Sequence, residues 1–415
     1  MLPSSAHPQP LLNDVTTLTT EIAERIPKNP ILSAATFSAR TDVSLPSLLD
    51  VGKPLAVSRG CAAIGLALQH AGIGKGDEVL LPAYHCISMI EPVVWRHATP
   101  AFYRISPDTS VDVADLEAKL APATRALVIT HYFGFPQDME PIRRLCDRHG
   151  IVLIEDCAHA FFGRVGTHAI GSFGDYAIGS VWKFFPVYDG GLLTSARREL
   201  SSLTLKSGGP FFQLKALLNV LELAFQFQRL RLLDRIMGFP LHLKDALWQR
   251  MKADARVEPR AATTLTRALG GWGFDAEVVT RKMSLVGRLV VRAASKARIA
   301  SIRRKHYLAL LEGLRGVTGG RPLFAELPAT VVPQVFPFLI DDPEKVFSRL
   351  KSAGVPVIRF GEYLWEGMDP QTCQVSTDLS RRVFQFPCHQ ELRDAEMDWM
   401  IAEIRAALRA ELPIY

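Results

Sequence analysis

The chain has 415 residues, of which 48% are hydrophobic and 22% are charged, a balance typical of a soluble globular protein and not of a disordered one. Its 48 Lys and Arg residues outnumber its 42 Asp and Glu residues, which gives a formal net charge of +6. On a chain of this length, that excess does not by itself indicate a nucleic-acid partner. The length predicts two domains, or one large domain with an appendage.

The six cysteines include no C-x-x-C pair, which argues against a zinc site or a dithiol redox motif, so we predict no metal. A disulfide framework is not expected at this size, which points to a reducing, cytoplasmic compartment. The N-terminus has neither the basic nor the apolar region of a signal peptide. The longest uncharged stretch, Gly60 to Gly74, has 15 residues, fewer than the roughly 20 of a membrane-spanning helix.

The first part of the chain, about 45 residues long, is rich in Pro, Ser and Thr and contains one amphipathic piece around Leu18 to Ile26. From Val57 to Ser195, short apolar strands alternate with helical stretches, a pattern that predicts parallel pairing and an α/β architecture. The expected strands are Glu78–Tyr84, Pro100–Ile105, Ala126–Phe133, Ile151–Ala158, Tyr176–Val181 and Gly191–Thr194, and the helices between them include Cys61–Ala71 and Met139–His149.

Residues 199–300 read as almost entirely helical, and the alternation returns from Val331. The elements expected there are strands near Gln334–Leu339, Val355–Arg359 and Val383–Phe386 and helices near Pro343–Ala353 and Asp394–Leu408. We therefore predict a large domain over residues 1–295 and a smaller C-terminal α+β domain over residues 296–415.

A predicted helix begins at Gly60 and Cys61 and continues with small residues. Free backbone N–H groups at a helix start favour an anion, and Gly60 would let a phosphate approach closely. The alternative is a glycine that opens an ordinary helix, which is common.

An acidic pair, Glu155 and Asp156, follows an apolar run, with His159 three residues after Asp156. Open α/β sheets bind their ligands beyond the carboxyl ends of the strands, where these residues would lie. The alternative is an acid that caps the following helix.

Lys183 lies between Trp182 and two phenylalanines, a poor setting for a permanent charge. Desolvation lowers the pKa of a lysine and makes it a better nucleophile toward aldehydes, whereas the alternative is a lysine that extends its ammonium group into solvent. A helix start, a carboxylate and a lysine in this order are what pyridoxal phosphate (PLP) needs for its phosphate, its ring nitrogen and its aldehyde.

Five segments in this order carry a family likeness: Gly72–Val79 with Leu81–Ala83, Arg125–Gly134, Glu155–Ala160, Ser180–Lys183 with the following glycines, and Phe386–Gln390. They resemble the DegT/DnrJ/EryC1/StrS-type sugar aminotransferases, and the resemblance runs from about Val57 to Ile404. It implies the type I PLP-dependent transferase fold: a large α/β domain with a mostly parallel sheet flanked by helices, plus a smaller C-terminal α+β domain.

The resemblance implies a role for each matching residue. Lys183 would bind the aldehyde of PLP and carry the proton, Asp156 would pair with the ring nitrogen, and His159 would lie near the O3′ side. Ser180 and the N–H groups of Gly60 and Cys61 would hold the phosphate. The set of catalytic and cofactor-binding residues is thus Lys183, Asp156, His159, Gly60, Cys61, Ser180 and His85.

Several positions depart from the family pattern. His85-Cys86 stands where the family has a ring-stacking aromatic, so stacking would fall to His85 or Tyr84. The usual serine five residues before the lysine is Ile178, and no asparagine occurs near residues 281–284 to contact a partner subunit's phosphate. Arg359 and His389 are candidate substrate contacts by position alone.

The segment of roughly Leu200–Leu265 is longer than its family counterpart, and residues 201–260 hold ten basic and five acidic residues, a net +5. A mostly apolar helix here carries a polar stripe formed by Lys215, Asn219, Glu222, Gln226 and Arg229. It is interpreted as an added core or dimer-interface helix. The alternative is a peripheral membrane or protein contact through Arg229, Arg231 and Arg235.

The function implied by the resemblance is amino transfer, from glutamate to a nucleotide-linked keto-sugar, by a PLP-dependent homodimer in polysaccharide or amino-sugar biosynthesis. No nucleic acid takes part. Lys183, rather than the histidine of a dehydrating subgroup, favours transamination. The alternatives are dehydration, transfer to a non-sugar ketone, and a catalytically silent regulatory or binding homologue.

Overall fold

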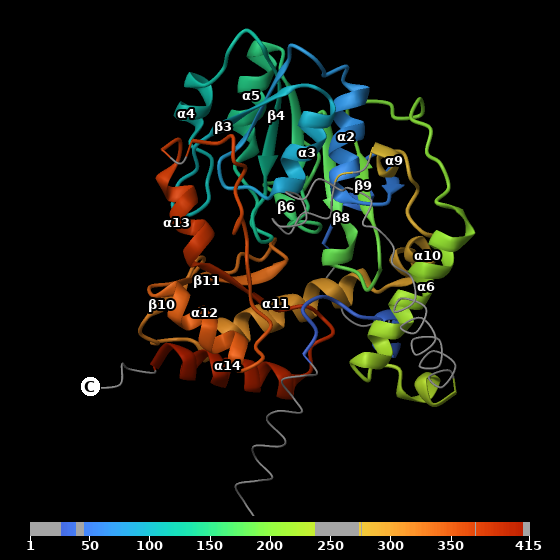
Figure 1. Ribbon diagram of the computed structural model, residues 1–415, viewed down its shortest axis with the longest axis vertical. Helices are drawn as coiled ribbons and strands as arrows, with labels where there is room; N and C mark the ends of the chain where they lie inside the picture. The colour runs from blue at the N-terminus through green and yellow to red at the C-terminus, as the bar shows by residue number, and fades with distance from the viewer. Residues whose placement is uncertain (1–25, 39–44, 237–273, 275, 370, 410–415) are drawn as a thin grey trace, which may run out of the picture.

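The computed structural model describes residues 26–38, 45–236, 274, 276–369 and 371–409. Two sheets organise them, a seven-stranded one in the upper half of Figure 1 and a four-stranded one in the lower half. The predicted α/β class with a smaller α+β part is confirmed. We propose a domain boundary between residues 295 and 296, where helix α11 (Lys296–Gly313) begins.

The seven strands of the large sheet lie in the order β1-β9-β8-β5-β4-β2-β3. Their bounds are Leu55–Val57, Gly191–Thr194, Tyr176–Ser180, Val152–Asp156, Thr124–Thr130, Glu78–Pro82 and Thr99–Tyr103. Only β9 runs antiparallel to its neighbours. The carboxyl ends of β5 and β8 therefore meet at one edge, which brings the segments that follow them together.

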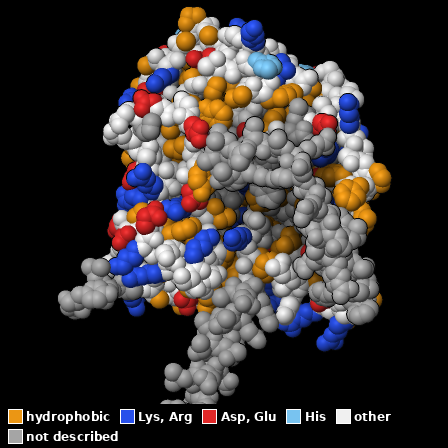
Figure 2. All heavy atoms as spheres, in the orientation of Figure 1, with side chains coloured by type: hydrophobic (Ala, Val, Ile, Leu, Met, Phe, Trp, Pro, Cys, Tyr) orange, Lys and Arg blue, Asp and Glu red, His pale blue; other side chains and the backbone are white. Residues whose placement is uncertain are grey.

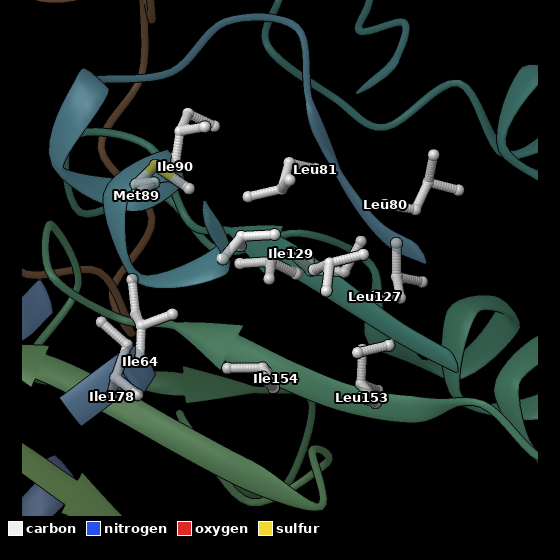
Figure 3. Packing of buried hydrophobic residues seen from close by; sticks show 14 of the residues in the cluster. Ile64, Leu80, Leu81, Met89, Ile90, Leu127, Ile129, Leu153, Ile154 and Ile178 are labelled. Atoms are coloured by element: carbon white, nitrogen blue, oxygen red, sulfur yellow. The ribbon is translucent and has the colours of Figure 1, made fainter. Parts of the chain in front are cut away.

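The middle strands are buried on both faces, as their continuous apolar runs predict. Figure 3 shows the packing between the sheet and the first two helices that cover it, α2 (Gly60–His70) and α3 (Ile87–Trp95). Each large aliphatic side chain buried here contributes roughly 1.5–3 kcal/mol. The labelled residues are Ile64, Leu80, Leu81, Met89, Ile90, Leu127, Ile129, Leu153, Ile154 and Ile178.

Further helices flank this sheet, namely α4 (Val113–Ala118) and α5 (Met139–His149). Helix α5 has the predicted bounds because Gly150 ends it in the left-handed conformation, with a φ of 64°. Three short 3-10 helices are η1 (Ala34–Phe37), η2 (Leu48–Asp50) and η3 (Val181–Lys183), and β6 (Arg164–Val165) pairs with β7 (His168–Ala169).

The small sheet is antiparallel, in the order β10-β11-β13-β12, with bounds Gly320–Pro322, Val335–Ile340, Val383–Pro387 and Ile358–Arg359. Helices α11, α12 (Pro343–Ser352) and α14 (Asp394–Arg409) pack with it, and α13 (Gln374–Arg382) contacts its strands β11 and β12. The predicted strand Val355–Arg359 pairs only at its last two residues. Val355 and Val357 instead bury their side chains in a second hydrophobic core, between the small sheet and its helices, and have no strand partners.

In the long segment after β9, helix α6 (Gly209–Gln226) packs on α10 (Leu285–Ala293), and residues 231–236 and α9 (Ala276–Val279) are also helical. The rest of the predicted insertion, residues 237–265, lies outside the described residues, as does nearly all of the amphipathic piece at Leu18 to Ile26. In the described part of the chain, no helix is both long and apolar enough to cross a bilayer.

The polar stripe predicted for this segment is not a uniform solvent face, and its last member, Arg229, lies beyond the end of α6 at Gln226. Arg229 places its Nη2 2.6 and 2.7 Å from the carboxylate oxygens of Glu396 in α14, and both side chains are less than 8% exposed. The alternative in which Arg229 meets lipid headgroups is therefore wrong, because its guanidinium forms a buried ion pair with Glu396. Arg231 and Arg235 remain exposed.

Candidate active site

Lys183 ends η3, directly after β8 at the carboxyl edge of the large sheet. Its Nζ lies 6.0 Å from the ring centre of Trp182. Burial lowers the pKa of the Lys183 ammonium group, while Cys86 and Asp156 act in the opposite direction. The side chain is thus desolvated, as its aromatic sequence neighbours suggest, and a larger share of its amine is neutral and nucleophilic.

Asp156 is the last residue of β5, the parallel neighbour of β8, and it points to the same edge as Lys183. Its carboxylate is buried and accepts a 2.9 Å hydrogen bond from the Ala158 backbone N–H. Burial raises the pKa of this carboxyl against the lowering effects of Ala158, Lys183 and His131. A cationic group bound beside Asp156 would offset the cost of keeping the carboxylate ionised there.

His159 is buried near Lys183, whose charge adds to the effect of burial in holding the imidazole pKa well below its usual value. The ring is therefore neutral. It stacks on Phe133, with 5.7 Å between centroids, and meets Phe360 edge-on at 4.8 Å. Its Nδ1 is buried without a hydrogen-bond partner among the described residues, and can hold a polar atom of a bound molecule.

Gly60, Cys61 and Ser180 come together where α2 begins beside the end of β8. A Cβ added to Gly60 would lie 3.5 Å from the Gly179 carbonyl oxygen and 3.7 Å from the Ser180 Cβ. Helix α2 has no side-chain cap and no acidic residue in its first turn, so its first N–H groups are available to an anion. The position therefore suits a phosphate group.

His85 does not join this group as a ring-stacking residue. Its Nδ1 lies 3.1 Å from the Pro82 carbonyl oxygen, and its Nε2 accepts a 3.0 Å hydrogen bond from the Trp365 N–H. The ring stacks on Phe102 at 5.0 Å, and the side chain is fully buried. Its two nitrogens are therefore used to join the end of β2 to the loop after β12.

Acid is expected to destabilise the protein through His85. Burial lowers the pKa of His85 from 6.5 to about 4, so the unfolded chain takes up this proton first as the pH falls. The free energy of unfolding should drop between about pH 6.5 and 4, by roughly 3 kcal/mol from this group at ~1.4 kcal/mol for each pKa unit. Urea unfolding of wild type and His85→Gln across this range measures the slope.

The substitution should flatten that slope, whereas His149→Gln, at an exposed position, should leave it unchanged. Equal slopes in wild type and His85→Gln would contradict the assignment. Other buried histidines titrate alike in all three proteins and cancel in the comparison.

A buried polar network supports the site from below. Glu155 accepts hydrogen bonds from the Nε2 of His131, at 3.1 Å, and from the N–H groups of Gly171 and Gly174. His131 in turn accepts one from the Gln137 N–H. With Cys157 these side chains come within 4.8 Å of one another, and the hydrogen bonds account for the grouping of Glu155 and His131 without a metal. The network fixes the residue next to Asp156.

Sequence reasoning missed Cys86 and Phe360. Cys86 is the N-cap residue that precedes α3, and both Lys183 and Asp156 affect the pKa of its thiol, which burial raises. The one sequence signal for Cys86 was that His85-Cys86 replaces the aromatic residue of the family pattern. Phe360 packs edge-on against Tyr84 as well as His159, and no local pattern marks it, because the contact joins distant parts of the chain.

The two candidate substrate contacts are engaged elsewhere. The guanidinium of Arg359 pairs with Glu344 and Glu362. The ring of His389 uses its Nε2 on the Pro27 carbonyl and its Nδ1 on the Glu391 N–H. These contacts occupy both ring nitrogens of His389 and both Nη atoms of Arg359.

Known proteins were compared with the chain as a whole. It is 42% identical over 118 residues to the L-glutamine:2-deoxy-scyllo-inosose aminotransferase of Streptomyces kanamyceticus, covering 28% of each chain. It is 34% identical over 166 residues to the UDP-N-acetyl-3-dehydro-alpha-D-glucosamine 3-aminotransferase of Acidithiobacillus ferrooxidans, covering 38% of this chain and 44% of that one. The match thus spans less than half the length of these relatives.

The fold extends further than the sequence identity. The crystal structure of a DegT DnrJ EryC1 StrS aminotransferase from Brucella abortus superposes with a TM-score of 0.60 at 18% identity, covering 87% of each chain. The fold is therefore that of the type I PLP-dependent transferases. A family profile matches residues 25–206, which hold every residue of the site described above except Phe360 and its loop. This segment matches the model of the DegT/DnrJ/EryC1/StrS aminotransferase family, so the family likeness is found in slightly less than half of the chain.

Proposed function

We propose that the protein is a PLP-dependent aminotransferase that moves an amino group from glutamate to a nucleotide-linked keto-sugar. The observation that carries this proposal is the meeting of Lys183 and Asp156 at the carboxyl ends of two adjacent parallel strands. Burial lowers the pKa of Lys183, which leaves more of its amine nucleophilic, and raises that of Asp156, which makes a cation beside its carboxylate favourable.

The residues present fit PLP. Burial disfavours the Asp156 carboxylate, so a bound cation would stabilise it, and the Nδ1 of His159 lacks a partner among the described residues. At Gly60 and Cys61, the first turn of α2 has no side-chain cap and can bind a phosphate. When bound, PLP supplies an aldehyde that reacts with amines and a ring that accepts electrons. These three positions correspond to its ring nitrogen, its ring oxygen and its phosphate.

The protein groups supply binding and proton movement. The Nζ of Lys183, partly neutral because it is desolvated, takes a proton from the substrate carbon and returns it one position away. Asp156 would hold the ring nitrogen of bound PLP in its protonated form. Phe133 and Phe360 both pack against His159, with 6.0 Å between their own ring centres, and the three rings form an aromatic wall that restricts water.

The donor half of the reaction is the direct test. The purified protein is loaded with PLP and mixed with glutamate or with glutamine, and pyridoxamine phosphate is measured by chromatography. Conversion by glutamate supports the proposal, and UDP- and GDP-linked keto-sugars are then compared with a free keto-cyclitol as acceptor. A dehydrated product without an amine, acceptance of the non-sugar ketone alone, or no conversion at all would contradict it in favour of one of the alternatives.

We further propose that the enzyme works as a homodimer in the cytoplasm, in the assembly of a surface polysaccharide or an amino-sugar product. Its support is the match of residues 25–206 to the aminotransferase family model. Light scattering on the purified protein checks the assembly, and a monomer that is fully active in the donor half-reaction would overturn it.

A surface formed by α6 and α10 is proposed to contact an anionic membrane. The Leu285 N–H donates to the Gln213 side chain, which holds the two helices together. Large apolar side chains on both helices are 41% to 73% exposed, and Figure 2 shows hydrophobic side chains at the edge of the molecule where α6 begins. Arg288 and Arg292 follow at helical spacing and supply charge that matches anionic headgroups. The apolar members are Phe211, Leu214, Leu217, Leu285 and Leu289.

Co-sedimentation with vesicles of phosphatidylcholine, alone or mixed equally with phosphatidylglycerol, tests this contact. Binding to the mixed vesicles should fall when Leu285 and Leu289 are both changed to Ser, and should not fall for Leu308→Ser, an exposed leucine of α11. If the double change leaves vesicle binding intact, or converts a dimer into a monomer, the surface is not a membrane contact.

A further inference from the structure

Arg303 of α11 is a completely buried arginine that contacts the main chain of the catalytic lysine. Its Nη2 donates a 2.7 Å hydrogen bond to the Lys183 carbonyl oxygen, and its guanidinium lies 4.5 Å from the ring centre of Phe184. Among the described residues it makes no ion pair with a carboxylate. The cation is thus held against carbonyl oxygens and an aromatic face.

Gln390, which follows β13, completes this arrangement. Its Oε1 accepts a 3.0 Å hydrogen bond from the Arg303 Nε, and its Nε2 donates one of 2.9 Å to the Phe184 carbonyl. Two successive carbonyl groups at the end of the lysine-bearing turn are therefore bound by two side chains that also bind each other. We refer to Arg303 and Gln390 as the carbonyl clamp.

Arg303 is also connected, through the main chain, to the aromatic wall formed by Phe133, Phe360 and His159. The Nη1 of Arg303 donates to the carbonyls of Pro333 and Gln334, at 3.2 and 2.8 Å. The Gln334 N–H then donates a 2.8 Å hydrogen bond to the carbonyl of Phe133, whose ring stacks on His159. One guanidinium thus fixes Lys183 relative to the aromatic wall across the site.

This arrangement is costly, which argues for a specific role. Burial lowers the pKa of Arg303 to about 10, a sign that the protein environment disfavours its charge. An apolar side chain would fill the same space without that penalty. Four of the five N–H donors of the guanidinium are used in a forked geometry that lysine cannot reproduce.

We propose that Arg303 and Gln390 are positioning residues that set the direction from which the Lys183 amine meets its carbonyl partner. This inference rests on the proposed function for the role of Lys183. It concerns the main chain of the lysine and requires no contact between the clamp and any ligand.

The test measures the reactivity of Lys183 directly. Wild type and variants are treated with pyridoxal, which lacks the phosphate, then reduced with borohydride, and the rate of label appearing on Lys183 is followed by mass spectrometry. Arg303→Met should slow this labelling by roughly 10- to 100-fold, the penalty typical of a misplaced reacting group, and Arg303→Lys should recover part of it. Arg304→Met is the matched control, because its neighbouring guanidinium binds the carbonyls of Pro328 and Val331 and does not touch Lys183.

Equal labelling of wild type and Arg303→Met, both folded by circular dichroism, would overturn the proposal, as would equal slowing by Arg304→Met. If Arg303→Met does not fold, Gln390→Met removes the bonds to the Phe184 carbonyl and to the Arg303 Nε but keeps the Arg303 bond to the Lys183 carbonyl, and it should slow labelling by a smaller factor. No slowing in that variant would count against the clamp. Failure of the proposed function is seen separately, as normal labelling of wild-type Lys183 without conversion of PLP by any amino donor.

Discussion

Replacement of Lys183 by alanine should lower the rate of amino transfer by a factor of about 10³ or more, because in the proposed mechanism this one side chain acts both as nucleophile and as proton carrier. The visible absorbance band of PLP bound to the lysine should vanish in the same variant. Stopped-flow absorbance with glutamate measures the rate, and a spectrum of the dialysed protein measures the band.

The matched control is Lys75→Ala, since Lys75 is exposed and makes no contact with the site. It should keep both the band and the rate. If the wild-type protein shows no band that Lys183→Ala removes, the enzyme interpretation fails and a binding or regulatory role gains support. Because burial disfavours the Lys183 ammonium, the variant should also be no less stable than the wild type without PLP.

Asp156→Asn should lower kcat by about 10²- to 10³-fold, the size expected for loss of one charged group aimed at the reacting system. Asparagine keeps the shape and the acceptor for the Ala158 N–H but cannot hold a ring nitrogen in its protonated form. Without PLP, the same change should raise the free energy of unfolding near neutral pH. The reason is that Asp156 has a raised pKa in the folded state, so its ionised form opposes folding there.

Steady-state kinetics and urea unfolding of the PLP-free protein measure the two effects, with Asp398→Asn as an exposed control expected to change neither. The opposite signs are diagnostic, since a residue of purely structural value would lose activity and stability together. Parallel losses in Asp156→Asn would therefore contradict the assigned role.

Much of the large domain follows from local sequence. The strand Gly191–Thr194 and the helix Met139–His149 occur with the predicted bounds, because glycines and a clear periodicity mark their ends. The short edge strand β10 and the reduced β12 were not predictable in this way. Their extent depends on hydrogen bonds with β11 and β13, which local propensity does not report.

The same division holds in the site. Lys183 and Asp156 are found from sequence because each follows an apolar strand, and parallel strands end at one edge. The direction of His85 is set by Trp365, far away along the chain, so its neighbours in sequence gave no sign of it. The carbonyl clamp could not be predicted either, because the roles of Arg303 and Gln390 depend on their contacts with each other and with the main chain at Lys183.

The ion pair between Arg229 and Glu396 limits how the long segment after β9 can be removed. A shortened chain that lacks α6 and the turn after it would leave the Glu396 carboxylate buried without its cation, at a cost of about 3–5 kcal/mol. Such a chain would then lose α14, and with it part of the second core, for reasons unrelated to what the segment binds. Deleting the segment together with Glu396→Gln is the better test of its role. That pair of changes removes the segment without leaving a buried, unpaired carboxylate, so any effect on binding comes from the segment itself.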